Sequence, residues 1–241
     1  MPEVNDHLVL ICGESAGGKS ASLRNLKKPE GVLYLNCEAG KHLPFPSKFK
    51  EVRVTDPKII PTYFEQIEKQ EQFHNVIIDS TTFMMDMFES MHVIGATNTM
   101  NAWGNYAQFF KNLMQDSVVN STKNVIMLAH IETILNEETM ISEHKVPVKG
   151  QLAKNGIEAF FSTVIYARKV SLKQLEGYEN DLLNITPEEE AMGMKYVFQT
   201  RLTKETINDR IRSNMGMWSI NETYIDNDAQ LIMDRLHQYY D

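Results

Sequence analysis

The chain has 241 residues, of which 42% are hydrophobic and 23% are charged, and its formal net charge is -8. This length suits one α/β domain with a buried sheet and is short for two, so we predict a single domain over residues 1–241. The acidic balance excludes a protein coated in basic surface, so any contact with nucleic acid must come from a local patch or loop.

The apolar runs are all too short to span a membrane, and residues 1–6 lack the charged and apolar regions of a secretion signal. The two cysteines, Cys12 and Cys37, each end an apolar run, which is typical of reduced, buried thiols. We therefore expect a cytoplasmic protein that does not contact a membrane.

Short apolar runs alternate with helical patterns along the chain. Strands are predicted at 8–12, 32–37, 51–54, 76–79, 124–129, 163–168 and 196–202. Helices are predicted at 19–28, 57–70, 83–93, 102–119, 152–161 and 228–239, with a projecting polar hairpin or loop over 132–149 and an acidic loop over 177–193. Continuous apolar strands alternating with helices predict an α/β fold, in which helices flank a mostly parallel central sheet.

A glycine-rich segment follows the first predicted strand and opens the first predicted helix. It consists of Gly13, Glu14, Ser15, Ala16, Gly17, Gly18, Lys19 and Ser20. The pattern G-x-x-x-x-G-K-[ST] is that of a phosphate-binding loop, whose backbone N–H groups face the phosphates of a nucleotide. Lys19 is expected to reach the outer phosphates and the Ser20 hydroxyl to bind magnesium, so we predict ATP and Mg²⁺ as cofactors.

Three further polar residues follow apolar strands and are candidates for the same site. Asp79 ends the strand at 76–79 and is expected to hold the magnesium ion, unless it only caps the next helix. Glu38 follows the strand at 32–37 and could orient the attacking water, or be a surface residue in a turn. His130 follows the strand at 124–129 and could sense the terminal phosphate, or be structural. No His, Cys, Asp or Glu cluster along the sequence has zinc-ligand spacing.

The order of these motifs resembles that of RecA-like ATPases, and more narrowly that of small phage RecA-like proteins of single-strand annealing or recombination. The resemblance runs from about Leu8 to about Arg212. It rests on the phosphate-binding loop, the strand ending in Glu38, the strand ending in Asp79-Ser80, the segment from Trp103 to Tyr106 and the strand ending in His130. The resemblance implies a RecA-like core in which Glu38, Lys19 and His130 act in hydrolysis. His130 takes the family's sensor position, which is often glutamine in RecA itself.

The resemblance also implies sites beyond the nucleotide. Residues Lys145, Lys149, Gln151 and Lys154 lie where RecA-like proteins carry a mobile DNA-binding loop, although a solvated polar loop is the alternative. Lys204 and Arg210 are placed like basic residues that reach a neighbouring subunit's nucleotide, with a solvated basic face as the alternative. The implied partners are single-stranded DNA, further copies of the chain in a ring or filament, and a single-strand binding protein. A phage origin would place the protein in the host cytoplasm.

Three functions remain open at this point. The first is an ATPase acting on single-stranded DNA in recombination, annealing or replication. The second is a motor or loader subunit acting through a protein partner. The third, a small-molecule kinase, is disfavoured because the chain has no convincing lid of clustered arginines.

Overall fold

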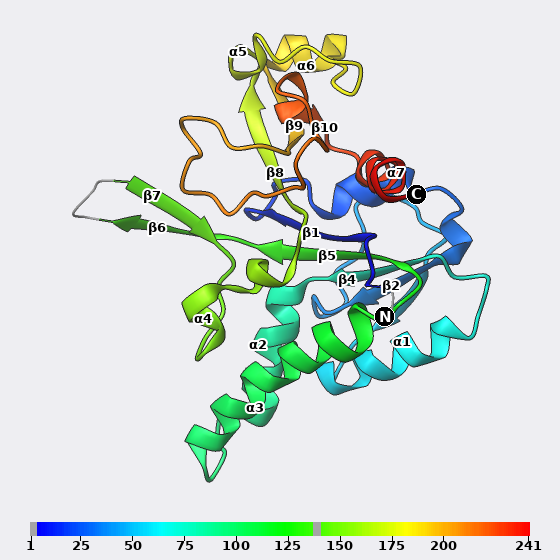
Figure 1. Ribbon diagram of the computed structural model, residues 1–241, viewed down its shortest axis with the longest axis vertical. Helices are drawn as coiled ribbons and strands as arrows, with labels where there is room; N and C mark the ends of the chain where they lie inside the picture. Colours follow the sequence, from blue (N-terminus) through cyan, green and yellow to red (C-terminus); the bar gives the residue numbers. More distant parts are fainter. Residues whose placement is uncertain (1–3, 137–140) are drawn as a thin grey trace.

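The computed structural model describes residues 4–136 and 141–241. Eight strands form one sheet in the order β10-β9-β8-β1-β5-β4-β2-β3 (Figure 1). They are β1 (Leu8–Gly13), β2 (Val32–Asn36), β3 (Lys50–Arg53), β4 (Asn75–Asp79), β5 (Asn124–His130), β8 (Val164–Ser171), β9 (Met194–Gln199) and β10 (Tyr224–Asp226). The six neighbouring strands β8, β1, β5, β4, β2 and β3 pair in parallel. Strand β9 pairs antiparallel with β8, and β10 pairs antiparallel with β9 at the edge of the sheet.

Helices cover both faces of this sheet. The α-helices are α1 (Ile60–Glu68), α2 (Thr81–His92), α3 (Thr99–Asn112), α4 (Leu152–Asn155), α5 (Leu172–Leu175), α6 (Pro187–Met192) and α7 (Ala229–Tyr240). Shorter 3₁₀ turns are η1 (Ser20–Asn25), η2 (Pro29–Gly31), η3 (Pro57–Ile59), η5 (Ile157–Phe160) and η6 (Asn221–Thr223), and η4 (Leu113–Val118) is a π-helical turn after α3. The predicted α/β fold with a mostly parallel, helix-flanked sheet is confirmed and is that of a P-loop NTPase.

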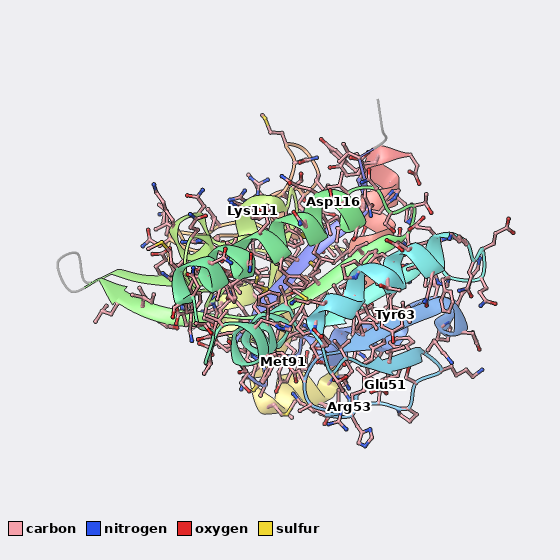
Figure 2. The ribbon with its side chains drawn as sticks, turned by 90° about the horizontal axis from the view of Figure 1, so that it is seen from below. Glu51, Arg53, Tyr63, Met91, Lys111 and Asp116 are labelled. Atoms are coloured by element: carbon pink, nitrogen blue, oxygen red, sulfur yellow. The ribbon has the colours of Figure 1, made fainter. Side chains whose placement is uncertain are left out.

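Alternating side chains of the central strands point into two separate cores. On β1, Leu8, Leu10 and Cys12 join the core under α1, α2 and α3, whereas Val9 and Ile11 join the core under η1 and α7. Figure 2 shows the first of these helical layers from below, with Tyr63 on α1, Met91 on α2 and Lys111 on α3. Burial on both faces explains why these strands read as continuous apolar runs.

A two-stranded hairpin continues directly from β5 and projects beyond the sheet (Figure 1). It consists of β6 (Glu132–Asn136) and β7 (Ile141–Lys145), which pair antiparallel. This agrees with the projecting hairpin predicted within 132–149. The tip, residues 137–140, lies outside the described residues.

Several predicted elements differ in the structure. The helix expected over 152–161 is broken at Gly156, whose φ is +74°, into α4 and η5. The helix expected over 19–28 is instead the short turn η1, in which the Ser22 hydroxyl donates to the Lys19 carbonyl at 2.6 Å and so favours tighter winding. The acidic segment expected to be a loop contains α6. Strand β10 was not predicted, because three residues are too few to show a period.

Among the helices of residues 4–136 and 141–241, none has the length and apolar character needed to cross a bilayer. Cys12 and Cys37 are buried and free, as expected.

Candidate active site

Four neighbouring parallel strands end at the same edge of the sheet and bring the predicted site residues together. The register pairs Gly13 of β1 with His130 of β5, and Asn36 of β2 with Asp79 of β4. Strand β5 separates β1 from β4, so the phosphate-binding loop and Asp79 come from strands that are not adjacent. These residues therefore lie at the edge of the sheet where parallel topology predicts a ligand.

The phosphate-binding loop, residues 13–20, turns tightly against β8. A Cβ atom on Gly13 would lie 2.6 Å from the Ala167 carbonyl oxygen, which leaves no room for a side chain. Gly18 has a φ of +93°, a backbone conformation that strongly favours glycine. These two glycines allow the loop to wrap closely around an anion while packed against its neighbour strand.

Lys19 is folded onto the loop that it follows. Its ammonium group donates to the carbonyl oxygens of Gly13 at 2.9 Å and Glu14 at 2.8 Å, and lies 3.4 Å from Nδ1 of His130. The side chain is buried, and this burial lowers the pKa of Lys19 to about 8 despite the nearby carboxylates of Asp79 and Glu38. A bound phosphate would supply the counter-charge that these neutral carbonyls lack.

Ser20 and Asp79 form the predicted cation-binding pair. The Ser20 hydroxyl donates to Oδ2 of Asp79 at 2.8 Å, and the Tyr34 hydroxyl donates to the same oxygen at 2.7 Å. Asp79 is buried, and its other oxygen, Oδ1, accepts no hydrogen bond within the described part of the chain. Burial raises the pKa of Asp79 and opposes its charge. A carboxylate oxygen left without a partner beside a serine hydroxyl fits Mg²⁺, which prefers oxygen ligands.

Glu38 and His130 contact each other directly. Nε2 of His130 lies 2.9 Å from Oε1 of Glu38, and the Lys41 ammonium donates to Oε2 at 2.9 Å. The hydrogen bond from His130 contributes most to lowering the pKa of Glu38 to about 2, so Glu38 is a carboxylate at neutral pH. An imidazole protonated on Nε2 satisfies both contacts of His130, donating to Glu38 while Nδ1 faces Lys19.

A cavity of about 870 Å³ opens over these groups. One end is lined by the loop, Tyr34, Glu38, Asp79 and His130, and the other by residues from the antiparallel edge of the sheet. This second wall includes Asn184, Thr186, Glu189, Lys195, Tyr196, Asp226 and Asn227. The cavity is therefore longer than the phosphate end alone and leaves space for a nucleoside.

Asn227 is a polar group of this second wall that lies against Gly18 of the loop. Its amide is within 3.3 Å of the position that a Cβ on Gly18 would take, and the Tyr196 ring approaches the same position to 3.1 Å. Asn227 is buried, and its Nδ2 makes no hydrogen bond among the described residues. A buried donor without a partner beside the phosphate-binding loop fits a ligand oxygen.

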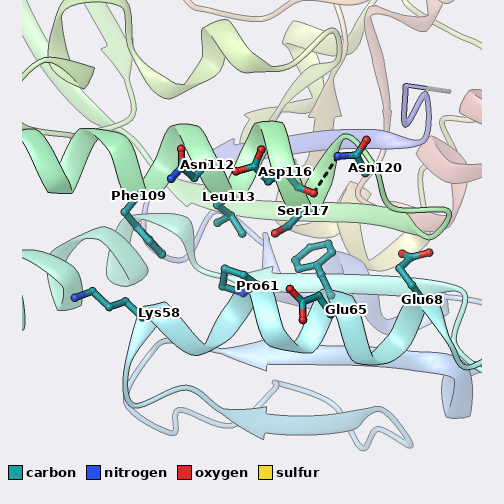
Figure 3. A pocket seen from close by; sticks show the side chains of 11 residues that line it. Lys58, Pro61, Glu65, Glu68, Phe109, Asn112, Leu113, Asp116, Ser117 and Asn120 are labelled. Atoms are coloured by element: carbon teal, nitrogen blue, oxygen red, sulfur yellow. Dashed lines mark hydrogen bonds between the residues drawn. The ribbon is translucent and has the colours of Figure 1, made fainter. Parts of the chain in front are cut away.

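A second cavity, of about 410 Å³, lies between α1 and the end of α3 (Figure 3). Pro61, Glu65 and Glu68 line it from α1, and Phe109 and Leu113 line it from the other side (Figure 3). Its walls come from the helical layer rather than from the edge of the sheet that carries the loop. We therefore place the nucleotide in the first cavity.

The residues predicted to bind DNA lie at the base of the β6–β7 hairpin and just after it. Lys145 ends β7 and is partly buried, whereas Lys149, Gln151 and Lys154 are exposed. The Lys149 ammonium donates to both carboxylate oxygens of Glu89 on α2, at 2.9 and 2.7 Å. Lys149 would have to exchange this ion pair to contact a phosphate.

The two basic residues predicted to act on a neighbouring subunit differ in their surroundings. Lys204 is exposed. Arg210 donates to Glu143 of β7 at 2.7 Å and to Glu158 at 3.4 Å, away from the cavity of its own chain. A role of Arg210 in trans would therefore require it to leave these contacts.

Several groups of the site were not predicted from the sequence. Tyr34 and Lys41 contact Asp79 and Glu38 through packing that no local pattern reveals. The wall around Asn227 depends on β9 and β10 joining the sheet. One part of this wall could have been predicted from the sequence. The segment Thr186-Pro187-Glu188-Glu189 has the form of a capping box, which indicates the start of a helix, and α6 begins there.

A family model described as an AAA domain matches residues 6–203. The chain belongs to this AAA domain family. The matched range contains the phosphate-binding loop, Glu38, Asp79 and His130, and it ends before Lys204 and Arg210. The chain thus carries an AAA-type P-loop ATPase domain, a nucleotide-binding class. Comparison with curated proteins gave no match.

Proposed function

We propose that this protein binds MgATP and hydrolyses it, as a RecA-like ATPase that acts on single-stranded DNA in recombination, annealing or replication. One observation carries the hydrolytic part. Lys19, His130 and Glu38 form a continuous polar chain beside the Ser20–Asp79 pair, all lining one cavity. A phosphate site, a cation site and an ionised carboxylate are thus close together, as phosphoryl transfer to water requires.

The roles of these residues follow from their chemistry. Lys19 would exchange the carbonyls of Gly13 and Glu14 for phosphate oxygens. Ser20 and Asp79 would hold Mg²⁺, which neutralises charge on the phosphates. Glu38, with a pKa of about 2, is a weak proton acceptor, so we assign it to orienting the attacking water rather than to removing its proton early. Tyr196 and Asn227 would contact the nucleoside.

The DNA part of the proposal is supported by the position of the hairpin. Strand β5 ends at His130, which contacts Glu38, and β6 begins two residues later at Glu132. The residues Lys145 and Lys149 follow on the same segment. A change at the phosphate end of the cavity would therefore reach the hairpin through the backbone of two consecutive elements.

A second function is favoured by a different observation. Large apolar side chains are strongly exposed around the turn between α2 and α3, where Ile94 in the turn is 68% exposed and Met100 in the first turn of α3 is 87% exposed. Others lie in the segment after β9, where Ile207 is 66% and Met215 94% exposed. Together with the net charge of -8, these surfaces favour a motor or loader subunit that acts through a protein partner.

The deciding experiment measures ATP turnover against protein concentration, with and without single-stranded DNA. We expect turnover that rises with DNA and, per chain, with protein concentration. Lys19→Ala should abolish nucleotide binding or turnover. Glu38→Gln should retain nucleotide binding while turnover falls by roughly 10²-fold or more.

The outcomes separate the alternatives. Turnover equal to that of Lys19→Ala under all conditions would contradict the ATPase proposal. Turnover without DNA stimulation, and no DNA binding at low salt with MgATP present, would instead favour the partner-dependent motor. Binding of DNA that weakens steeply with added salt is the expected signature of phosphate contacts.

A further inference from the structure

The start of β1 and the end of α7 bring two imidazoles and a carboxylate together, far from the proposed nucleotide site. His7 directly precedes β1, and His237 and Asp241 lie one turn apart at the end of α7. One potential ligand atom from each of the three residues lies within 4.8 Å of those of the other two. The sequence could not predict this cluster, because His7 and His237 lie 230 positions apart in the chain.

One of the two contacts within the cluster has the spacing of two metal ligands, whereas the other has that of a hydrogen bond. Nε2 of His7 lies 3.3 Å from Oδ1 of Asp241, and Nδ1 of His237 lies 2.8 Å from Oδ2 of the same carboxylate. Two ligands of a tetrahedral zinc ion, each about 2.0 Å from the metal, lie about 3.3 Å apart. The two imidazole rings have their centroids 4.0 Å apart, closer than two histidine ligands of one tetrahedral ion, so the rings would move apart on binding it.

His7 is held in place and presents an unused ligand atom. Its backbone N–H donates to the Asn5 side chain at 3.0 Å, and its carbonyl accepts from Val125 of β5 at 2.9 Å. Its Nε2 is shielded from solvent and makes no hydrogen bond of good geometry within residues 4–136 and 141–241. A buried nitrogen without a hydrogen-bond partner, facing a histidine and an aspartate, indicates a site for a bound ligand.

We propose that His7, His237 and Asp241 bind one divalent transition-metal ion of the zinc class. Two imidazole nitrogens and one carboxylate oxygen form a donor set typical of zinc, with water as the fourth ligand at this partly exposed site. The ion would tie the first residue before β1 to the end of α7. Because the other end of β1 carries the phosphate-binding loop, the ion would brace the strand on which that loop is built.

The test uses the full chain without a histidine tag and without nucleotide, titrated with Zn²⁺ by calorimetry and followed by thermal unfolding. We expect one equivalent to bind, and the melting temperature to rise by roughly 5 °C when free zinc is about a hundredfold above Kd. Co²⁺ in place of zinc should give the visible absorption of a tetrahedral site. His7→Gln and His237→Gln should each lose the binding and the thermal shift.

The pair His92 and Asp56 provides a matched control. These side chains also lie 3.3 Å apart, but their neighbour is the Lys58 ammonium, 3.4 Å from His92, instead of a second histidine. His92→Gln should therefore bind zinc as the wild type does. The proposal is overturned if zinc fails to bind the wild type, or if the His7 and His237 variants bind it equally well. The outcome does not depend on whether the protein hydrolyses ATP.

Discussion

At the scale of single residues, the phosphate-binding lysine is the group whose chemistry can be tested most directly. Lys19 is buried against two carbonyl oxygens, and burial lowers its pKa to about 8. A triphosphate favours the charged ammonium and so raises this pKa again. We therefore predict that nucleotide binding takes up a proton above pH 8, and that affinity falls as pH rises further, because part of the free protein is neutral at Lys19.

Calorimetry at pH 8.5 in two buffers of different ionisation enthalpy measures this uptake, since the phosphates themselves are fully ionised there. Lys19→Arg provides the control, because a guanidinium stays charged over this range. Its binding should show no proton uptake even if it is weaker. Equal uptake by the wild type and the arginine variant would mean that another group is responsible.

At the scale of elements, two adjacent residues after β9 fasten that segment to the hairpin. Asp209 contacts both His144 of β7 and Arg168 of β8, and Arg210 contacts Glu143 and Glu158. Glu158 is fully buried and also accepts from the Val146 N–H at 2.8 Å. The segment that carries Lys204 is therefore anchored to the hairpin that carries the predicted DNA-binding residues.

This anchoring predicts the effect of removing the arginine. Arg210→Ala leaves the Glu158 carboxylate buried without its cation, which should cost about 3–5 kcal/mol of unfolding free energy. Lys204→Ala, an exposed change in the same segment, should stay within about 0.5 kcal/mol of the wild type. Denaturant unfolding measures both. Glu158→Gln added to Arg210→Ala should recover part of the loss, and unchanged stability of Arg210→Ala would show that the ion pair is unimportant.

The elements also show where sequence reasoning succeeds and where it ends. The central strands and the positions of Glu38, Asp79 and His130 could be predicted, because each residue ends a buried apolar run and parallel strands share one ligand edge. The roles of Tyr34 and Lys41 could not be predicted, because their contacts depend on which strands become neighbours in the sheet. Strand β10 and Asn227 were missed for the same reason, since a three-residue strand is defined by its partner β9 rather than by its own pattern.

At the scale of the whole molecule, one sheet connects the proposed nucleotide cavity, the hairpin and the cluster at His7. The groups that line the cavity include those proposed to bind the phosphates, to hold Mg²⁺ and to orient the attacking water. Lys204, in contrast, lies on an exposed segment outside the cavity. If Lys204 acts as a cation on the nucleotide of a neighbouring copy, each complete site needs two chains. Isolated chains would then bind ATP and hydrolyse it slowly.

Mixing two inactive variants tests this arrangement. We predict that Lys204→Ala folds and binds ATP normally but turns over about 10³-fold more slowly, because charge developing on the phosphoryl group is no longer offset. Lys19→Ala should be inactive through its own loop but still offer Lys204 to a neighbour. In an equal mixture, a site needs an intact loop from one chain and Lys204 from the next, so about a quarter of the interfaces should work. Turnover near a quarter of the wild-type value would support action between subunits. A mixture no more active than its components, or full activity of Lys204→Ala alone, would contradict it and place all the catalytic groups within one chain.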